Sequence, residues 1–220
     1  MILSNSKKTA FIFISASIAI VAISFFSCQK ELSPGITNFI PALPDLTSNV
    51  SSSVSGFVTD ENDAVVSGAA ITAGGSNVVT DKYGFFDIKN VQVLKEAAVV
   101  TVTRAGYFKA IKTWLATEGK AAFFRVKLIP KTSAGNIDAI TGGKVTLANG
   151  VIISIPANTV IDIATNPIYI GRVNLAANWI NPASSDLNRT MPGDLRGVDS
   201  AGILKLLTTY GMVAVELTGS

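Results

Sequence analysis

Histidine is absent from the 220 residues, and cysteine occurs once, as Cys28. Catalytic arrangements of the Ser-His-Asp and Cys-His types need an imidazole base, so the sequence excludes them. The absence of histidine also excludes zinc sites built from imidazole, and the single cysteine excludes zinc sites built from several thiolates. A lone thiol also cannot form a disulfide bond within its own chain. The sequence therefore predicts no catalytic residues, no metal site and no cofactor.

Charged residues are also scarce, because they make up 15% of the chain while hydrophobic residues make up 48%. The formal net charge is +3, but Lys7 and Lys8 lie ahead of Cys28. Without these two lysines the 18 basic residues fall to 16, against 15 acidic residues. A chain so close to neutral offers no electrostatic footprint for a polyanion, so we expect no nucleic-acid partner.

The N-terminal segment has the pattern of a secretory leader. Lys7 and Lys8 form its positive start, and residues 9–26 form an apolar run, TAFIFISASIAIVAISFF. The run ends at Ser27, directly ahead of Cys28, and no basic cluster follows that would stop transfer through a membrane. We therefore expect cleavage between Ser27 and Cys28. An uncleaved transmembrane helix, for which the run is nearly long enough, and an ordinary secretory cut are the alternatives.

Residues Phe25-Phe26-Ser27-Cys28 resemble the processing box of a bacterial lipoprotein of the Bacteroidota type, with aromatic residues where leucine and a small residue are more usual. The resemblance implies that diacylglycerol is attached to the Cys28 sulfur and that the new amino group is acylated. Several acyl chains hold a protein firmly on a membrane, whereas one chain binds only marginally. We expect a lipid bilayer partner through Cys28, in the cell envelope at the outer membrane, facing the periplasm or the surface.

The rest of the chain predicts an all-β protein. A Pro-, Ser- and Asn-rich stretch after Cys28 is typical of a flexible tether, and short β-rich runs separated by turn residues then predict a β-sandwich. The strands expected in the sandwich are 54–59, 69–73, 77–80, 85–88, 98–104, 108–115 and 121–129. The expected parts of the chain are a leader at 1–27, a tether at 28–52, a first module at 53–131 and a second β-rich module at 132–220.

The segment VTDKYGFFDI predicts a tight hairpin turn in the first module. Asp81 can accept hydrogen bonds from backbone amides two or three residues further on, and Gly84 can adopt a positive φ. Phe86 and Ile88 then share one face of the following strand, because side chains alternate along a strand. We expect both residues to enter the core of the sandwich.

Residues 55–91, SGFVTDENDAVVSGAAITAGGSNVVTDKYGFFDIKNV, and the later VVTVTRAGYFKA resemble the carboxypeptidase regulatory-like domain, a small transthyretin-like β-sandwich. The resemblance covers about eighty residues. The positions that match the family pattern are Gly56, Val58, Asp60, Gly68, Ala69, Val79, Thr80, Asp81, Gly84, Phe86, Ile88, Val91, Gly106 and Tyr107. It implies a module that is not itself catalytic and that accompanies peptidases, outer-membrane receptors and surface lipoproteins.

The second module begins with a hairpin pattern. KVTLANGVIISIPANTV places two apolar runs around Asn149-Gly150, the pair favoured in type I′ turns, and further strands are expected at 168–179 and 212–217. GRVNLAANWINP, MPGDLRGVDSAG and TTYGMVAVEL resemble a segment that follows the regulatory-like module in Bacteroidota surface proteins and, more distantly, the β-domain shared by netrin receptors and ankyrins. Because the sequence stops directly after a strand, we expect this module to be truncated, with a partner strand or further protein missing.

Two sets of side chains could serve a function in these modules. Asp194, Asp199 and Glu216 satisfy no spacing rule for the paired carboxylates of glycoside hydrolysis, so surface acids are the favoured interpretation. The aromatic residues Trp114 and Trp179, together with two tyrosines, could stack on sugar rings, although aromatic residues in strands more often fill the core or an edge. The two tyrosines are Tyr107 and Tyr169.

The sequence thus predicts a membrane-anchored, non-catalytic cell-surface lipoprotein whose β-sandwich has structural or recognition roles. Its expected partners are the bilayer and a protein or glycan at the cell surface. One alternative is a glycan-binding component of a polysaccharide uptake system, with Trp114 and Trp179 as the stacking residues. Another is the non-catalytic N-terminal part of a larger surface enzyme, whose catalytic domain would lie beyond Ser220.

Overall fold

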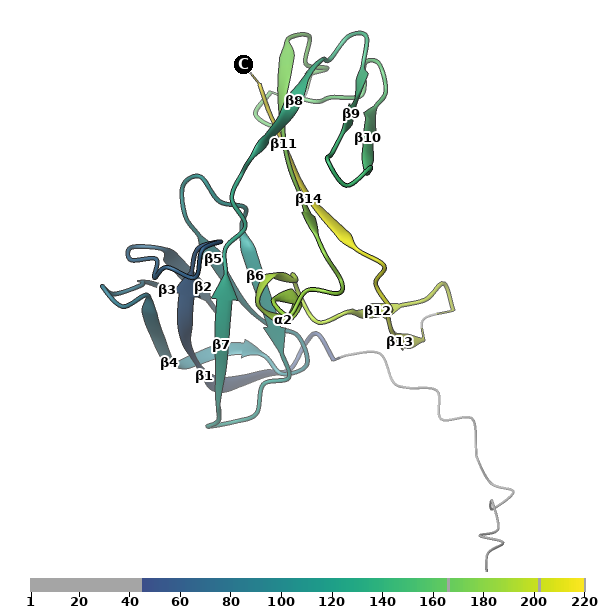
Figure 1. Cartoon of the computed structure of the whole chain (residues 1–220). Helices are drawn as coiled ribbons and strands as arrows, with labels where there is room; N and C mark the ends of the chain where they lie inside the picture. Colours follow the sequence, from purple (N-terminus) through teal and green to yellow (C-terminus); the bar gives the residue numbers. More distant parts are fainter. Residues whose placement is uncertain (1–44, 166, 202, 220) are drawn as a thin grey trace, which may run out of the picture. The chain divides into compact units, whose positions relative to one another are not determined.

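The computed structural model describes residues 45–165, 167–201 and 203–219. Strands are the main regular structure of these residues, which also contain one short helix, α2 (Leu187–Thr190). No helix in this part of the chain is long and apolar enough to cross a membrane. The predicted all-β class is therefore confirmed (Figure 1). Ser27 and Cys28, with the leader and most of the expected tether, lie outside the described residues.

The first module is a β-sandwich whose two sheets each draw strands from distant parts of the sequence (Figure 1). One sheet, in the order β4-β1-β7, contains β1 (Asn49–Thr59), β4 (Phe85–Leu94) and β7 (Ala121–Lys127). The other, in the order β3-β2-β5-β6, contains β2 (Ala70–Ala73), β3 (Ser76–Val79), β5 (Ala98–Thr103) and β6 (Ala110–Trp114). β1 runs antiparallel to β4 and parallel to β7. All seven expected strands are present, with shifted ends.

Side-chain alternation fills the space between these two sheets. Val54 and Val58 of β1 are fully buried, as are Ile71 of β2 and Val100 of β5 on the opposing sheet. Phe86 of β4 is 2% exposed and joins the same cluster, as the sequence pattern predicts. Burial of each such side chain stabilises the fold by about 1.5–3 kcal/mol. The sandwich therefore has a continuous core of its own.

The expected tether extends too far, because residues 49–52 already belong to β1. They pair with β4, from Asn49 opposite Leu94 to Ser52 opposite Val91. Ser52 is 2% exposed, and its hydroxyl donates to the Lys120 carbonyl at 2.8 Å. A serine-rich composition suggested a linker, but a serine that satisfies its hydroxyl on the backbone can occupy an inward strand position.

The turn at residues 81–84 crosses from one sheet to the other. Oδ1 of Asp81 accepts the amides of Tyr83 at 2.8 Å and Phe85 at 2.9 Å, and Gly84 has a φ of 73°. The sequence predicted a hairpin here, which is wrong, because β3 and β4 lie in different sheets and do not pair. A turn sequence fixes the local reversal of the chain but not the sheet that the next strand joins.

The second module has a smaller core between a sheet and a hairpin (Figure 1). The sheet, in the order β14-β11-β8, contains β8 (Ser133–Asp138), β11 (Arg172–Ile180) and β14 (Met212–Gly219). The hairpin contains β9 (Gly143–Thr146) and β10 (Ile152–Ile155). A separate pair contains β12 (Arg196–Val198) and β13 (Leu204–Leu206). Leu175 and Val173 of β11 are at most 1% exposed and form the centre of this core.

The predicted β9–β10 hairpin is present, but its turn is not of type I′. Thr146 pairs with Ile152, so five residues connect the strands, and the Leu147 amide donates to the Val151 carbonyl at 2.8 Å. Gly150 has a φ of 86°, whereas Asn149 is not among the residues with positive φ. A type I′ turn needs positive φ at both central positions, so the longer loop replaces it.

Gly84 gives a test of the crossing turn. A Cβ atom at this position would lie 2.6 Å from the Val58 carbonyl oxygen, in a backbone conformation that alanine disfavours. We expect Gly84→Ala to lower the free energy of unfolding by about 2–4 kcal/mol. Gly106→Ala is the matched control, because Gly106 has a φ of 83° but open space around it, and should cost only about 1 kcal/mol. Urea denaturation measures both variants. If the two lose the same free energy of unfolding, the close approach to the Val58 carbonyl is unimportant.

Candidate functional site

The segment of residues 186–196, which we call the strap, joins the two modules. It contains α2 and belongs by sequence to the second module, yet its hydrogen bonds reach β1, β6 and β7 of the first. None of the α2 residues is fully buried, and Leu187, Met191 and Leu195 of the strap are partly buried. Polar contacts connect the strap to the first module.

One of these contacts comes from Lys112, the buried residue of β6. Its side chain is on the same face as Trp114, next to Val100 of the sandwich core, and the residue is only 4% exposed. The ammonium Nζ donates to the carbonyls of Asn188 at 2.8 Å and Met191 at 2.7 Å. Asn188 lies within α2 and Met191 directly follows it, and the carbonyls in the last turn of a helix have no partner inside the helix. Burial lowers the pKa of Lys112 to about 8.

A network of four charged side chains lies beside this contact. Lys127 of β7 contacts the carboxylates of Asp186 at 2.7 Å and Asp63 at 3.1 Å, and Arg189 of α2 contacts the same two acids at 2.8 and 2.6 Å. Hydrogen bonds from Arg189 and then from Lys127 lower the pKa of Asp63, and the bond from Lys127 lowers that of Asp186. Each charge thus has an opposite neighbour from the other module.

The end of the strap contacts the β6 side of the sandwich. The Gly193 amide donates to the Ile111 carbonyl of β6 at 3.1 Å, on the edge of the four-stranded sheet. Arg196 donates to the Glu96 carbonyl at 3.0 Å while its Nε contacts Asp194 at 2.5 Å. The strap thereby covers an edge strand that would otherwise offer unpaired backbone groups.

The acids considered from the sequence are spread over separate structural contacts. Asp194 pairs with Arg196, and Glu216 pairs with Lys131 at 2.7 Å. Asp199 accepts the amide of Ile203 at 2.9 Å and lies 3.7 Å from an exposed lysine, Lys205. The described residues contain no cluster of three acids, cysteines or histidines that could hold a metal ion.

The aromatic residues considered as a sugar platform lie in different surroundings. Trp114 packs against Phe124, with ring centroids 5.8 Å apart, and its indole nitrogen is buried, so it belongs with the first core. Tyr107 also packs against that core, whereas Tyr169 packs against the second. Trp179 of β11 borders two hollows, and Tyr169 borders a third one beside β14.

Sequence reasoning missed an exposed aromatic group on the outer face of the β4-β1-β7 sheet. The Phe57 ring lies 5.2 Å from that of Phe85 and 6.1 Å from that of Phe123, centroid to centroid. The ring planes are inclined by 53° and 69°, so the group presents ring edges and not a flat stacking surface. Period-two alternation could have identified it, since each ring is on the face opposite to the core.

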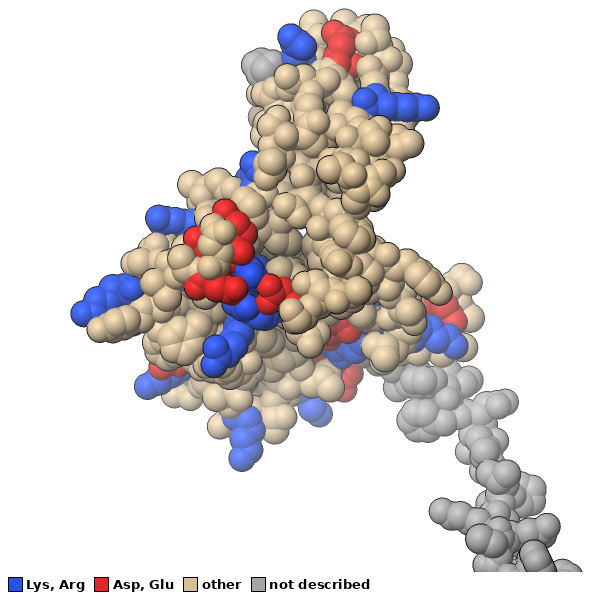
Figure 2. Space-filling view, viewed as in Figure 1, with Lys and Arg blue, Asp and Glu red and all other residues tan. Residues whose placement is uncertain are grey.

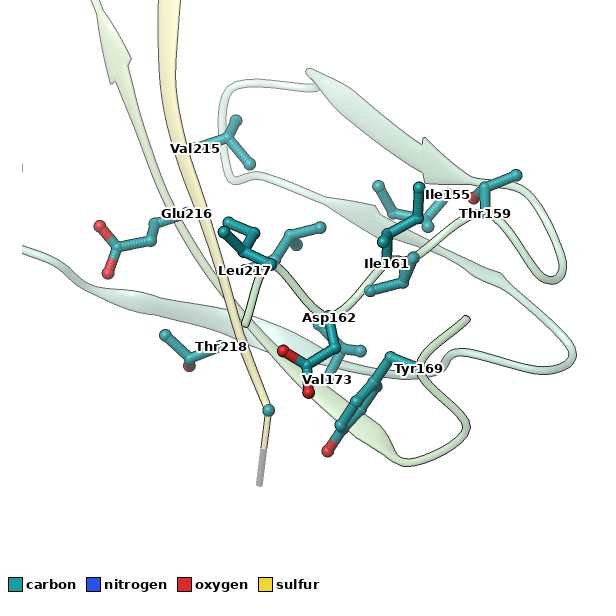
Figure 3. A pocket seen from close by; sticks show the side chains of 13 residues that line it. Ile155, Thr159, Ile161, Asp162, Tyr169, Val173, Val215, Glu216, Leu217 and Thr218 are labelled. Atoms are coloured by element: carbon teal, nitrogen blue, oxygen red, sulfur yellow. The ribbon is translucent and has the colours of Figure 1, made fainter. Parts of the chain in front are cut away.

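Three hollows are large enough to receive a ligand or partner. One of about 390 Å³ is bordered by Trp179, Asn178 and Asn181 of the second module and by strap and β7 residues, including Asp186 and Lys127. A second, of about 430 Å³, lies on another side of Trp179. The third, of about 640 Å³, is mainly apolar and lies beside β14 (Figure 3). On the face drawn in Figure 2, acidic and basic side chains lie next to one another without a large patch of one sign. This surface fits a polar or apolar ligand better than a polyanion.

Lys112 gives the contact with the strap a pH dependence. Between pH 8 and the ordinary lysine value of 10.5, the unfolded chain holds a proton that the folded chain has released, so raising the pH favours the folded state. The neutral amine keeps two N–H donors for the two carbonyls. We expect the free energy of unfolding to rise by on the order of 2 kcal/mol across this window, relative to a Lys112→Met variant.

Urea denaturation of both proteins at several pH values measures this difference. Lys109→Met is the matched control, because Lys109 is exposed on the same segment of the first module and should leave the pH dependence unchanged. Parallel curves for the parent and Lys112→Met would contradict the assignment.

The first module matches a known protein family. Residues 53–128 match the family model of the carboxypeptidase regulatory-like domain. The TIE protein of Bacillus anthracis matches 71% of this chain with 12% identity and a TM-score of 0.32, and the chain spans 31% of its length. A proposed carbohydrate-binding protein from Bacteroides uniformis matches 77% of this chain, and 80% of its own, with 9% identity and a TM-score of 0.27. No curated protein matches the sequence significantly.

The family match coincides with the sandwich defined by the first core. That core contains residues from Val54 to Leu128, which are almost the limits of the matched region. The family is a regulatory-like, non-catalytic one, and the hydrogen-bonded turn at Asp81 and Gly84 lies within it. The chain therefore contains a carboxypeptidase regulatory-like domain at residues 53–128.

Proposed function

We propose that this chain is a membrane-anchored, non-catalytic lipoprotein with a recognition role at the cell envelope. It would present the two β modules that the strap joins. The observation that carries the proposal is that its acidic side chains form structural contacts. Asp63 and Asp186 hold the strap, and Asp194, Asp199 and Glu216 each hold a turn or an ion pair. Asp63, Asp186 and Glu216 pair with residues of the other module. Acids committed to structural contacts in this way are poorly placed to transfer protons.

The anchor is proposed from the leader sequence. The apolar run at residues 9–26 ends at Ser27-Cys28, and a hydrogen-bonded module begins soon afterwards, where the Asp45 amide donates to the Glu96 carboxylate at 2.7 Å. In the proposed maturation, the Cys28 thiolate, its proton lost to solvent, attacks the glyceryl carbon of a membrane phospholipid, so that a thioether to diacylglycerol forms and the phosphorylated headgroup leaves. Water then hydrolyses the peptide bond after Ser27, and the new amino group of Cys28 takes an acyl group from a phospholipid ester, which leaves a lysophospholipid. The acyl chains would hold the modules at the outer membrane.

Intact mass spectrometry of the membrane fraction tests the anchor. We expect a mature chain that starts at Cys28 and carries the mass of the added fatty acids, because the leader is removed ahead of the acylated residue. Cys28→Ala should abolish both the added mass and the membrane association. A native chain that starts elsewhere, or that carries no fatty acid, would refute this part of the proposal.

A second candidate function, glycan binding, is favoured by the hollow beside Trp179. That hollow combines an indole with the amides of Asn178 and Asn181 and the carboxylate of Asp186. Sugar rings offer apolar faces to an aromatic ring and hydroxyl groups to amides and carboxylates. The hollow thus has the mixed lining that small polar ligands need, within the usual range of binding-site volumes.

Affinity electrophoresis in polysaccharide gels tests this candidate. If the hollow binds glycans, the parent protein should be retarded, and Trp179→Ala should lose most of the retardation because it removes the aromatic face. Tyr210→Ala is the matched control, since Tyr210 is 93% exposed and does not border the hollow. A parent protein that migrates unretarded through a panel of envelope and plant polysaccharides would exclude glycan binding.

A further inference from the structure

β14 leaves one side of its sheet open. It pairs with β11 over its whole length, from Met212 opposite Ile180 to Gly219 opposite Val173, without a register shift. In the sheet order β14-β11-β8 it is an edge strand, and within the described residues no turn or loop bonds to its backbone from the other side. Alternate amides and carbonyls of β14 therefore point away from the sheet.

The two edge strands of this sheet, β8 and β14, differ in how readily another strand could pair with them. β8, at the far edge, has a register shift opposite Leu175 and Ala176, and it ends at the charged Asp138. Shifts and charges of this kind keep other strands from pairing with an edge. β14 contains no proline and a single charged residue, Glu216, which Lys131 neutralises on the outer face at 2.7 Å. β14 is therefore a regular edge strand that has none of the features that keep another strand from pairing with it.

An apolar hollow adjoins the same strand. Val215 and Leu217 point from β14 toward it, while Glu216 and Thr218 point the other way (Figure 3). The hollow measures about 640 Å³, and Ile161 stands on its far wall. Val215 is 43% exposed and Ile161 55% exposed, which leaves much apolar surface in contact with water.

The free edge and the hollow fit one kind of occupant. A strand added beside β14 would continue the sheet, and its alternate side chains would lie on the same face as Val215 and Leu217, above the hollow. Asp162 also borders this space, and its carboxylate accepts the Ala164 amide at 2.9 Å but forms no ion pair within the described residues. A basic side chain on the added strand would complement that charge.

We propose that β14 and this hollow form a strand-accepting site for an extended segment of a partner protein, with apolar side chains at alternate positions and a basic residue near one end. The segment pairs antiparallel with β14, as the other strands of the sheet do. The inference deepens the recognition role proposed above and rests on it for the existence of a partner. It is independent of the acylation of Cys28, which the mass measurement tests separately.

Fluorescence anisotropy with a labelled peptide tests the site in the full chain held in detergent. The probe is an eight-residue peptide in which valine and threonine alternate and a lysine stands at one end. We expect saturable binding and slower amide hydrogen exchange in Met212–Gly219. The same peptide with alternate backbone amides methylated should bind on the order of tenfold more weakly, because it cannot complete the ladder. Equal binding of the two peptides would overturn strand addition.

Ile163→Asp tests the hollow without risk to the fold, because Ile163 borders the hollow and is 99% exposed. It should weaken peptide binding by on the order of tenfold, since a carboxylate would face the apolar side chains. Ile152→Asp, an exposed isoleucine outside the hollow, should leave binding unchanged.

Three other results would overturn the proposal. The peptide could fail to bind. Exchange in Met212–Gly219 could already be slow in the free protein, which would mean that the edge is occupied. The chain could form a dimer that Val215→Asp dissociates, which would identify a second copy as the occupant.

Discussion

The buried ammonium of Lys112 is the contact on which the joining of the two modules depends. No side chain of α2 is fully buried, and the strap contacts the first module through hydrogen bonds and ion pairs. Lys112 satisfies one carbonyl within α2 and one directly after it, and Lys127 and Arg189 pair with two acids beside this contact. Removal of one partner from such a buried arrangement leaves polar groups unsatisfied, which costs more than the bond itself contributes.

Much of the first module could be predicted because its strands follow period two. Phe86 and Ile88 entered the core, and the turn residues between the strands separated the seven runs. The start of β1 could not be predicted in the same way, because Ser52 satisfies its hydroxyl on Lys120, a partner 68 positions away. The sheet that β4 joins could not be predicted either, because the turn at Asp81 can lead into either sheet of a sandwich.

The candidate sites were harder to predict, for a physical reason. Lys112 stands between Ile111 and Thr113 in a strand, where a lysine normally indicates the solvent face. Its acceptors are backbone carbonyls, which every residue carries, so no pattern identifies them. The hollows beside Trp179 and β14 arise from segments that are far apart in the sequence. Trp114 and Trp179 were chosen by residue type, and only their packing separates a core residue from one that borders an open space.

The parallel pairing of β1 with β7 has a mechanical consequence for a chain held at its N-terminus. Tension would enter through the start of β1 and leave through the end of β7, where the second module begins. These strands lie side by side over seven residue pairs, from Ser53 opposite Ala121 to Thr59 opposite Lys127. A pull in opposite directions on two parallel neighbours loads all the bonds between them at once, in shear, and does not peel them apart one by one. The first module is thus connected so as to resist stretching.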